Sequence, residues 1–355
     1  MRILIDGFWW NAGPYSNRMV SVETVKQWVR QFPQDEVILA IPKLRESESD
    51  HSTIPSGIEV VDTHLRKHPA INLLELPIIA KRKRVDATLT FSFSSSSKRS
   101  AVFLHDVLYQ SNPEWFSWAE RRYFSLIPVL ARRPQSVITT SKNERERIIE
   151  HNPRLKRVIN CGLAVFPPLA RAAIERPNLN IAESSYIVCV GRFNVRKNLE
   201  RTVRALQKTK LISPHFPVVL IGEASGVPAD FSEFADALAE KSVIMASNLS
   251  NGELKWLYKN CRFFVCLSLD EGFGLPVVEA ATFGAPVLVS DIPVFRETVG
   301  SYGTFTEPTD LDSIAAAALE LNQSVGRSRE PYTEQFGWES ICLKIRDELL
   351  LIAQS

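Results

Sequence analysis

Short apolar runs alternate with longer amphipathic segments along almost the whole chain, and this alternation restricts the fold more than any other feature. Runs such as 187–190 and 263–267 are continuously apolar. Such runs are typical of strands that are buried on both faces of a parallel sheet. The segments between them carry apolar residues at helical spacing. Strands and helices in this alternation predict doubly wound α/β domains, with helices covering both faces of each sheet.

The expected strands fall into two groups. They lie at 2–8, 37–41, 58–61, 87–91, 101–105 and 136–141, and then at 186–191, 217–221, 242–245, 262–267 and 286–290. The expected helices lie at 16–31, 70–80, 114–132, 143–150, 199–209, 230–240, 250–260, 276–283, 311–321 and 334–353. Open α/β sheets bind ligands at the carboxyl ends of their strands, so chemistry is expected in the loops that follow the strands.

The length of 355 residues predicts two domains rather than one core. We expect a first Rossmann-like domain at 1–165 and a second at 186–330. Between them, 166–185 contains three prolines and reads as a linker. The segment 331–355 carries a final amphipathic helix.

Composition excludes several classes of protein. The formal net charge of +2 gives no indication of nucleic-acid binding. No apolar run reaches the roughly 18 residues of a membrane-spanning helix, and the first residues read as a strand rather than a signal peptide. A cytoplasmic location is therefore expected. The five cysteines form no CxxC pair, which predicts buried free thiols.

The stretch VGRFNVRKN, residues 190–198, places two cations between a strand and a helix. Arg192 and Lys197 lie in the loop that follows the expected strand end at Gly191. Positive charge beside a helix N-terminus suits a diphosphate and would stabilise negative charge on a leaving group. A solvated basic loop is the alternative interpretation of this stretch taken alone.

The stretch DEGFGLPVVEAATFGAPV, residues 270–287, contains two glutamates separated by a glycine-rich turn. Glu271 precedes the expected helix, while Glu279 lies within it. This arrangement suits one ligand lying across a helix N-terminus better than the opposed carboxylates of a glycoside hydrolase. Neither glutamate has a His or Asp at metal-ligand spacing, so no metal site is expected. A purely structural glutamate is the alternative for either residue singly.

Together the two stretches resemble the donor half of a retaining glycosyltransferase of family 4 (group 1), on the GT-B fold. In that family a Glu is followed by seven residues and a second Glu, as in Glu271 and Glu279. A Gly-Arg loop carries a Lys five residues after the Arg, as in Arg192 and Lys197. The family ends in a Trp-led helix that crosses back to the first domain, and residues 336–338 match its start. The resemblance implies two Rossmann-like domains facing each other across a cleft.

The resemblance also implies roles in the second domain, which would bind the nucleotide-sugar donor. Arg192 and Lys197 would hold the diphosphate, and Glu279 would accept hydrogen bonds from the ribose. Glu271 and the following loop would hold sugar hydroxyls and the distal phosphate. The implied donor-binding residues are Gly13, Asn248, Leu249, Gly272, Phe273, Gly274, Leu275 and Glu279, with Asn248 and Leu249 near the base. The co-substrate would be a nucleotide-diphosphate sugar, with no obligatory cofactor or metal.

The first domain would bind the acceptor. His105 and Asp106 follow an expected strand, and by resemblance His105 contacts the transferred sugar or orients the acceptor, completing a catalytic set with Arg192, Lys197 and Glu271. A capping role for His105 is the alternative. Gly13 matches the family's glycine loop by position, although its run of glycines is reduced to Ala-Gly-Pro. Trp9 could stack on a sugar or belong to the core.

Two further features of the first domain concern its surface. His64 and His68 lie in a polar stretch and are expected to be exposed. Lys81, Arg82, Lys83 and Arg84 form a basic cluster, which suggests either peripheral contact with anionic lipid at the inner face of a membrane or a solvated helix end.

The expected function is transfer of a hexose from a GDP-mannose or UDP-glucose type donor to a glycan or lipid-linked saccharide, in cell-surface polysaccharide synthesis. A nucleotide-sugar epimerase or a phosphorylase on the same fold is one alternative. A non-catalytic sugar-nucleotide-binding subunit is another. A dehydrogenase is disfavoured because no GxGxxG follows an expected strand.

Overall fold

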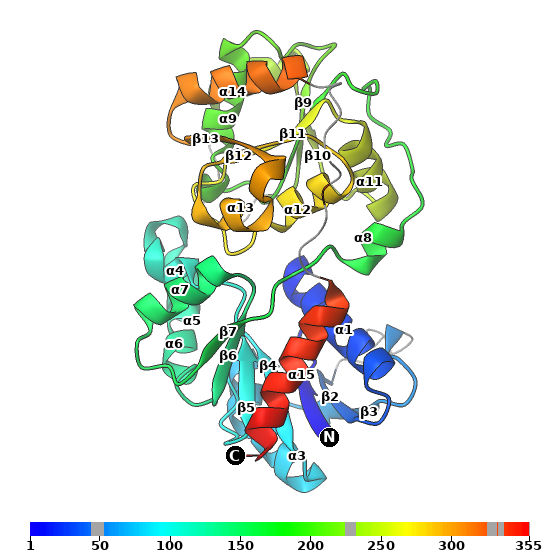
Figure 1. Ribbon diagram of the computed structural model, residues 1–355, viewed down its shortest axis with the longest axis vertical. Coiled ribbons are helices and arrows are strands. Elements are labelled where there is room, and N and C mark those ends of the chain that lie inside the picture. Colours follow the sequence, from blue (N-terminus) through cyan, green and yellow to red (C-terminus); the bar gives the residue numbers. More distant parts are fainter. Residues whose placement is uncertain (44–52, 224–231, 325–331, 333–336, 355) are drawn as a thin grey trace. The chain divides into compact units, whose positions relative to one another are not determined.

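The computed structural model of the protein describes residues 1–43, 53–223, 232–324, 332 and 337–354 (Figure 1). Backbone contacts divide the chain into two compact units. Unit 1 comprises Met1–Ser111, Arg121–Leu163 and Phe336–Ser355, and unit 2 comprises Asn112–Glu120 and Ala164–Gln335. The expected boundary at 330/331, the expected helix start at 334 and Phe336 lie outside the described residues.

Unit 1 is built on a seven-stranded sheet in the order β3-β2-β1-β4-β5-β6-β7, and every pair of neighbouring strands is parallel. Its strands are β1 (Arg2–Asp6), β2 (Glu36–Pro42), β3 (Glu59–Thr63), β4 (Ala87–Phe91), β5 (Ser100–Phe103), β6 (Ser136–Thr139) and β7 (Val158–Asn160). The helices between these strands along the chain are α1 (Tyr15–Gln31), α2 (His68–Ala70), a π-helical turn (Ile71–Glu75), α3 (Leu76–Lys83), α4 (Leu108–Ser111), a 3₁₀ turn (Pro113–Trp115), α5 (Trp118–Phe124), α6 (Leu126–Leu130) and α7 (Lys142–His151). Of these, the 3₁₀ turn and residues 118–120 at the start of α5 are assigned to unit 2.

Unit 2 is built on a six-stranded parallel sheet in the order β10-β9-β8-β11-β12-β13. Its strands are β8 (Ile187–Val190), β9 (Val218–Ile221), β10 (Val243–Ala246), β11 (Phe263–Cys266), β12 (Val287–Ser290) and β13 (Gly303–Thr306). Its helices are α8 (Pro167–Arg171), α9 (Leu199–Lys208), α10 (Ala235–Ala239), α11 (Asn251–Asn260), α12 (Leu275–Thr282), α13 (Pro293–Thr298) and α14 (Leu311–Ser324), with 3₁₀ turns at Val195–Lys197, Ser232–Phe234 and Gly300–Tyr302.

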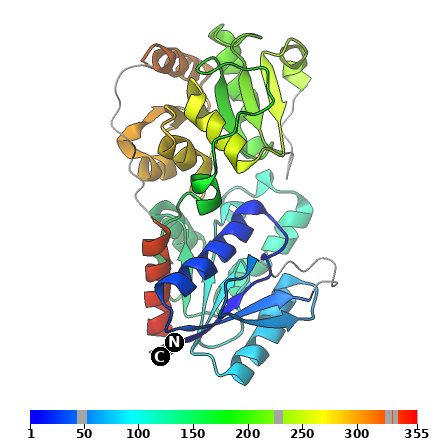
Figure 2. The same ribbon diagram turned by 90° about the vertical axis from the view of Figure 1, so that its right-hand side faces the viewer.

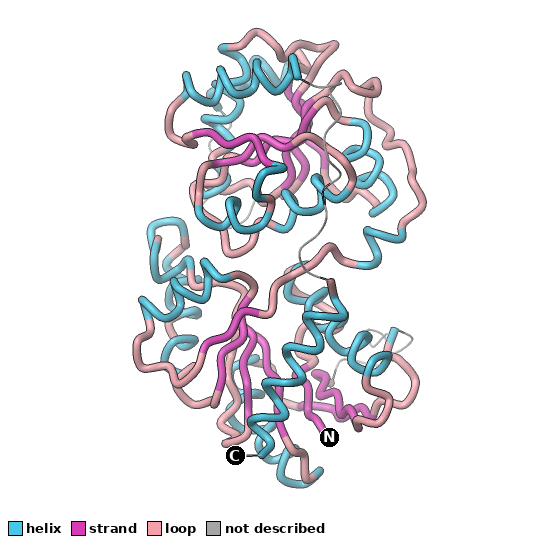
Figure 3. Tube along the Cα trace, viewed as in Figure 1, coloured by secondary structure: helices cyan, strands magenta, loops and turns pink. Residues whose placement is uncertain are grey.

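The expectation of two doubly wound parallel sheets is confirmed. Strands run through the middle of each unit and helices lie outside them (Figure 3). Every residue of β9 and β11 is buried, which explains why these strands read as continuous apolar runs. All five cysteines are buried and free, and burial raises the pKa of the Cys161 thiol to about 12.

Several elements differ from the expectation, among them two strands and one divided helix. β7 and β13 were missed, and each is the last strand at an edge of its sheet. They are only partly buried and lack a continuous apolar run. The single helix expected at 114–132 is divided into a 3₁₀ turn, α5 and α6.

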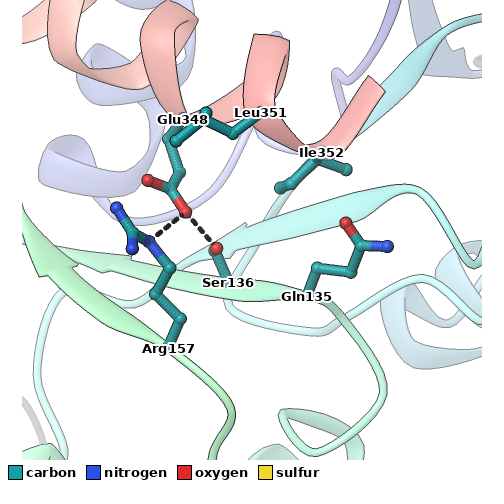
Figure 4. A pocket seen from close by; sticks show the side chains of 6 residues that line it. All are labelled: Gln135, Ser136, Arg157, Glu348, Leu351 and Ile352. Carbon is teal, nitrogen blue, oxygen red and sulfur yellow. Dashed lines mark hydrogen bonds and ion pairs between the residues drawn. The ribbon is translucent and has the colours of Figure 1, made fainter. Parts of the chain in front are cut away.

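The last helix, α15 (Trp338–Gln354), packs against unit 1, where it lies beside α1 (Figures 1 and 2). Trp338, Ile341, Ile345 and Leu349 are buried there. The buried carboxylate of Glu348 pairs with Arg157, at 2.7 Å from Nε to Oε1, and accepts a hydrogen bond from Ser136 on β6 (Figure 4). The helix is thereby attached to the sheet by polar contacts as well as by its apolar face.

Candidate functional site

Two loops of unit 2 meet at the carboxyl edge of its sheet. One follows β8 and the other follows β11, and these two strands are neighbours at the point where the strand order reverses. In open α/β sheets this is where ligands bind. The loops are joined directly, since the amide of Leu269 donates to the carbonyl of Arg196 over 2.9 Å.

Lys197 and Glu271 form a buried ion pair between the two loops. Nζ of Lys197 lies 2.7 Å from Oε1 of Glu271, and both side chains are less than a tenth exposed. Arg196 pairs with the other carboxylate oxygen and also donates to the carbonyl of Asp270 over 3.1 Å. Burial alone would raise the pKa of Glu271, but Arg196 and Lys197 outweigh it and hold that pKa at about 2. The site therefore presents two cations and one carboxylate together.

Arg192 occupies a different position in the same loop. Its side chain is exposed and has no hydrogen-bond or ion-pair partner within the described parts of the chain. The preceding Gly191 lies against Lys197, whose Cε would be 2.8 Å from a Cβ at that position. Of the two cations expected from the sequence, Lys197 is buried and Arg192 is exposed, and the contact of Arg196 with Glu271 was not anticipated.

Glu279 is a buried residue of α12 that accepts a hydrogen bond from a tyrosine of α11. The hydroxyl of Tyr258 donates to Oε2 of Glu279 over 2.9 Å. Burial, and then the adjacent carboxylate, raise the pKa of Tyr258 well above its ordinary value, so the hydroxyl stays protonated and acts as the donor. Tyr258 was not anticipated, because it lies 21 residues before Glu279 and in no recognisable motif.

The loop from Gly272 to Gly274 leads into α12. Gly274 is the N-cap, at a left-handed φ of 80°, and no side chain caps the helix. A Cβ on Gly274 would lie 2.3 Å from the ring of Phe295, so both conformation and space demand glycine. Phe273 is buried and Leu275 begins the helix. The first backbone N–H groups of α12 are thus not capped by a side chain, which is what anion binding at this helix start would require.

Asn248 and Leu249 lie between β10 and α11. Asn248 is exposed, with a φ of 55°, and Leu249 is partly buried. Immediately after them, Ser250 and Glu253 form a capping box that begins α11. This pair fixes where the loop ends.

His105 and Asp106 follow β5 at the carboxyl edge of the sheet in unit 1. Both are partly buried. The carbonyl of His105 accepts from Thr140 over 3.2 Å, and Asp106 accepts from the amide of Leu108 over 3.2 Å. The amide of Val107 donates to the fully buried Glu144 over 2.7 Å. Glu144, which was not anticipated from the sequence, therefore holds the loop that carries both predicted residues.

His68 corrects one expectation. It was expected on the surface with His64; His64 is exposed, but His68 is 1% exposed. Its Nε2 lies 2.7 Å from Oδ2 of Asp6, at the end of β1. Oδ1 of the same carboxylate accepts from the amide of Phe8 over 3.0 Å, and the ring of Phe8 stacks on His68 with centroids 4.1 Å apart. The polar residues around His68 suggested an exposed position, because its partner Asp6 lies 62 residues away and does not show in the local pattern.

Trp9 and Gly13 belong to the loop that follows β1. Trp9 packs edge-on against both Phe8 and His68. Gly13 has a φ of 111°, and a Cβ there would lie 2.1 Å from the ring of Trp9. Trp9 is therefore packed into this loop, and glycine is required at position 13 because of it.

Among the described residues, no group of three His, Cys, Asp or Glu side chains is placed to hold a metal ion. No helix in the described part of the chain is long and apolar enough to cross a membrane.

Known proteins match both the sequence and the fold. Residues 171–333 match a family described as glycosyl transferases group 1. The O-antigen chain mannosyltransferase B of Escherichia coli is 26% identical over 259 residues, covering 68% of each chain. The GDP-mannose:cellobiosyl-diphosphopolyprenol alpha-mannosyltransferase of Xanthomonas campestris is 27% identical over 226 residues, which cover 60% of this chain and 57% of that protein.

A solved structure matches the fold over the full length. A sucrose-phosphate synthase from Thermosynechococcus elongatus superposes with a TM-score of 0.70 at 17% identity, covering 100% of both chains. At this identity the likeness concerns the architecture of the two units.

Proposed function

The chain belongs to the group 1 glycosyltransferases, the retaining family 4 enzymes of the GT-B fold, and from this premise we propose that it transfers a mannosyl residue from GDP-mannose to a saccharide or lipid-linked saccharide acceptor. The observation that carries the proposal is the buried cluster of Lys197, Arg196 and Glu271 at the switch point of the unit 2 sheet. The relatives named above are mannosyltransferases, which favours mannose over the glucose of a UDP-glucose donor.

In this proposal the second domain, with the expected bounds 186–330, binds the donor. Lys197, Arg196 and the exposed Arg192 balance the charge of the diphosphate, in place of an obligatory metal ion. Glu271 and the backbone of 272–275 hold sugar hydroxyls and the distal phosphate, and Glu279 accepts from the ribose. Asn248 and Leu249 lie beside the base. Cations that are fixed before the reaction stabilise a developing negative charge without reorganising.

The first domain, 1–165 with the helix of 331–355, binds the acceptor. His105 and Asp106 act on the transferred sugar and the acceptor hydroxyl. The loop of Gly13 reaches toward the donor's diphosphate as well as the acceptor, and Trp9 borders the acceptor. The relative from Xanthomonas campestris acts on a diphosphopolyprenol-linked saccharide, as its name states, and we extend that acceptor class to this chain.

Retention of configuration fits transfer on the face from which the diphosphate leaves. The glycosidic bond to the diphosphate breaks as the acceptor oxygen bonds to the anomeric carbon, and the acceptor proton passes to the departing phosphate oxygen. The site needs no second opposed carboxylate for this step. The location of Glu271 and Glu279, before and within one helix, agrees with that requirement.

Lys81, Arg82, Lys83 and Arg84 are proposed to support peripheral contact with the inner face of a membrane. Lys81, Arg82 and Arg84 are exposed, while Lys83 pairs with Glu59. This pairing leaves three of the four cations for anionic lipid.

The experiment measures binding and transfer separately. Binding is followed by thermal shift with GDP, UDP, dTDP and ADP, and GDP is expected to stabilise most. Transfer from GDP-mannose to a polyprenyl-diphosphate-linked saccharide is followed by mass spectrometry, which also distinguishes transfer from isomerisation or phosphorolysis. Lys197→Ala should lower turnover about a hundredfold, on the order of 3 kcal/mol.

Lys208→Ala provides the matched control. Lys208 lies on the same unit, in an exposed ion pair with Asp312, and its loss should leave transfer unchanged. Near-normal turnover by folded Lys197→Ala would refute the assignment of the cluster.

A further inference from the structure

Asp6 lies at the switch point of the unit 1 sheet, where the strand order reverses between β1 and β4. It is the last residue of β1, and its Oδ2 accepts from the amide of Phe91, the last residue of β4, over 3.3 Å. Open α/β sheets bind ligands at this place. Asp6 therefore occupies in unit 1 the position that the loops of Lys197 and Glu271 occupy in unit 2.

Four donors surround the buried carboxylate of Asp6. The amides of Phe8 and Phe91 donate to it over 3.0 and 3.3 Å. Nε2 of His68 lies 2.7 Å from Oδ2, and Nδ2 of Asn72 donates to the same oxygen over 3.1 Å. Burial alone would raise the pKa of Asp6, but the attraction of His68 and three of these hydrogen bonds hold that pKa below its ordinary value. Asp6 is therefore ionised at neutral pH and holds His68 by a charge-assisted bond.

The helical segment that carries His68 and Asn72 has an uncommon geometry. α2 runs directly into the π-helical turn, and Asn72 lies in that turn, where it also donates to the carbonyl of Phe93 over 2.6 Å. Such π-helical turns are rare and are frequent at functional sites. This turn brings a second polar side chain to the carboxylate at the switch point.

Stability alone does not explain this cluster, because it contains buried polar atoms without partners. Nδ1 of His68, Oδ1 of Asn72 and Nε1 of Trp9 are buried and have no hydrogen-bond partner among the described residues. Burying a polar atom without a partner is unfavourable, and apolar side chains often replace a buried ion pair without loss of stability. Proteins keep such arrangements mainly where function requires them.

The ring of His68 supports the loop that follows β1. The ring of Phe8 stacks on it with an interplanar angle of 2°, and Trp9 packs edge-on against it with centroids 5.3 Å apart. His68 itself is buried, whereas Phe8 and Trp9 are partly exposed. His68 thus fixes two rings that a ligand can reach, although it is not accessible itself.

We propose that Asp6 and His68 are positioning residues of the transfer reaction. They hold the loop after β1 at the switch point of unit 1, so that Trp9 stacks on a saccharide ring of the acceptor. Tryptophan offers a large rigid apolar face at little conformational cost. This role rests on the proposed function, in which the first domain binds the acceptor. Every residue of the cluster belongs to unit 1.

The first test measures the ring of Trp9 in the protein without substrate. Subtracting the near-ultraviolet circular dichroism of Trp9→Phe from that of the wild type isolates the signal of Trp9, which is strong when the ring is fixed among aromatic neighbours. His68→Leu removes both the ring and the bond to Asp6, and it should abolish most of this signal when compared with His68→Leu/Trp9→Phe. Asp6→Asn keeps every ring and should reduce the signal in the same direction.

The second test is transfer from GDP-mannose, with cellobiosyl-diphosphopolyprenol as the probe for the acceptor. His68→Leu should raise the KM for this acceptor about tenfold, while the KM for GDP-mannose and the thermal shift with GDP stay unchanged. Asp35→Asn is the matched control, because the side chain of Asp35 is also buried in unit 1 but pairs with Arg346 of α15. This control should lower stability and leave both the Trp9 signal and the acceptor KM unchanged.

An unchanged Trp9 signal or an unchanged acceptor KM in folded His68→Leu would overturn the proposal, and so would an equal rise of that KM in Asp35→Asn. If His68→Leu does not fold, Asp6→Asn carries both tests. Lys197→Ala should lower turnover but keep the Trp9 signal, which distinguishes a failed donor assignment from a failed role of His68. A wild type that does not use the acceptor probe would count against the proposed function, and the Trp9 signal would still decide whether His68 positions the loop.

Discussion

Glu279 and Tyr258 show how a single hydroxyl can set the geometry of a candidate ligand group. The tyrosine is fully buried and stays protonated, so it donates to one oxygen of the carboxylate and restricts how that carboxylate can turn. A carboxylate held in one orientation loses less entropy when it accepts from a ligand.

We predict that Tyr258→Phe weakens binding of the correct nucleoside diphosphate by about tenfold, since a charge-assisted hydrogen bond is removed. Isothermal titration calorimetry measures the change. Tyr186→Phe is the matched control, because Tyr186 is also buried and donates to the carbonyl of Leu257 over 3.0 Å, away from Glu279. Equal losses of affinity in the two variants would contradict a specific role for Tyr258.

The lowered pKa of Glu271 predicts a pH dependence of stability. Its folded-state pKa of about 2 lies below the ordinary 4.5, so the carboxylate stabilises the fold above pH 4.5 and this contribution is lost as the pH falls towards 2. Urea unfolding should show wild type more stable than Glu271→Gln at neutral pH, with a difference that shrinks on acidification by on the order of 3 kcal/mol. Glu240→Gln, at an exposed position of unit 2, should show no such trend.

Among single residues, those that belong to a spaced motif could be predicted from the sequence. Contacts that the motif does not include, or that join distant parts of the chain, were missed. Lys197 and Glu271 were expected in one site, and they contact each other. Arg196 was overlooked although it neighbours Lys197 and shares its partner Glu271, because the spacing that singled out Arg192 and Lys197 passes over position 196. His68 was missed because its partner Asp6 lies 62 residues away, and a polar neighbourhood says nothing about that partner.

At the scale of elements, α12 starts on a glycine and not on a residue whose side chain could cap it. Gly274 and Gly284 flank this helix with nearly equal φ values, 80° and 86°. Only the first lies against another residue, because a Cβ would meet Phe295 at 2.3 Å at position 274 and nothing within 4 Å at position 284.

Substituting each of these two glycines separates the free-energy cost of backbone strain from the cost of steric overlap. Gly284→Ala should cost about 1 kcal/mol for its left-handed backbone. Gly274→Ala should cost roughly 1–3 kcal/mol more, because Phe295 must move. Chemical denaturation provides both values, and equal values would show that Phe295 yields without cost.

The elements themselves were mostly readable from the sequence. Central strands such as β9 and β11 are buried throughout and stand out as apolar runs. The edge strands β7 and β13 have a neighbour on one side only and carry Asn, Gly or Thr. Their pairing depends on the sheet already being present, so the local pattern could not reveal them.

At the scale of the whole molecule, one helix far along the chain completes the first unit. Asp35, whose side chain is buried, accepts from Arg346 of α15 over 2.7 and 3.1 Å and from Trp28 of α1 over 3.2 Å. The carboxylate therefore joins elements that are about three hundred residues apart in sequence.

Asp35→Asn should destabilise unit 1 by about 3 kcal/mol, because it leaves a largely buried guanidinium without its counter-charge. Hydrogen exchange should accelerate in α1 and α15 and remain unchanged in α9 and α11 of unit 2. Asp291→Asn removes an exposed bidentate pair with Arg296 in unit 2 and should change little. Faster exchange spread equally over both units would contradict this division.

The assignment of α15 to unit 1 also sets an order of assembly on the ribosome. Domains usually fold as they emerge, with the N-terminal one first. Here the buried face of unit 1 is completed by residues 338–352, which are translated after every strand of unit 2. Unit 2 can reach its final state while unit 1 still exposes the surface that α15 covers. During synthesis the unit that begins first is thus the one that finishes last.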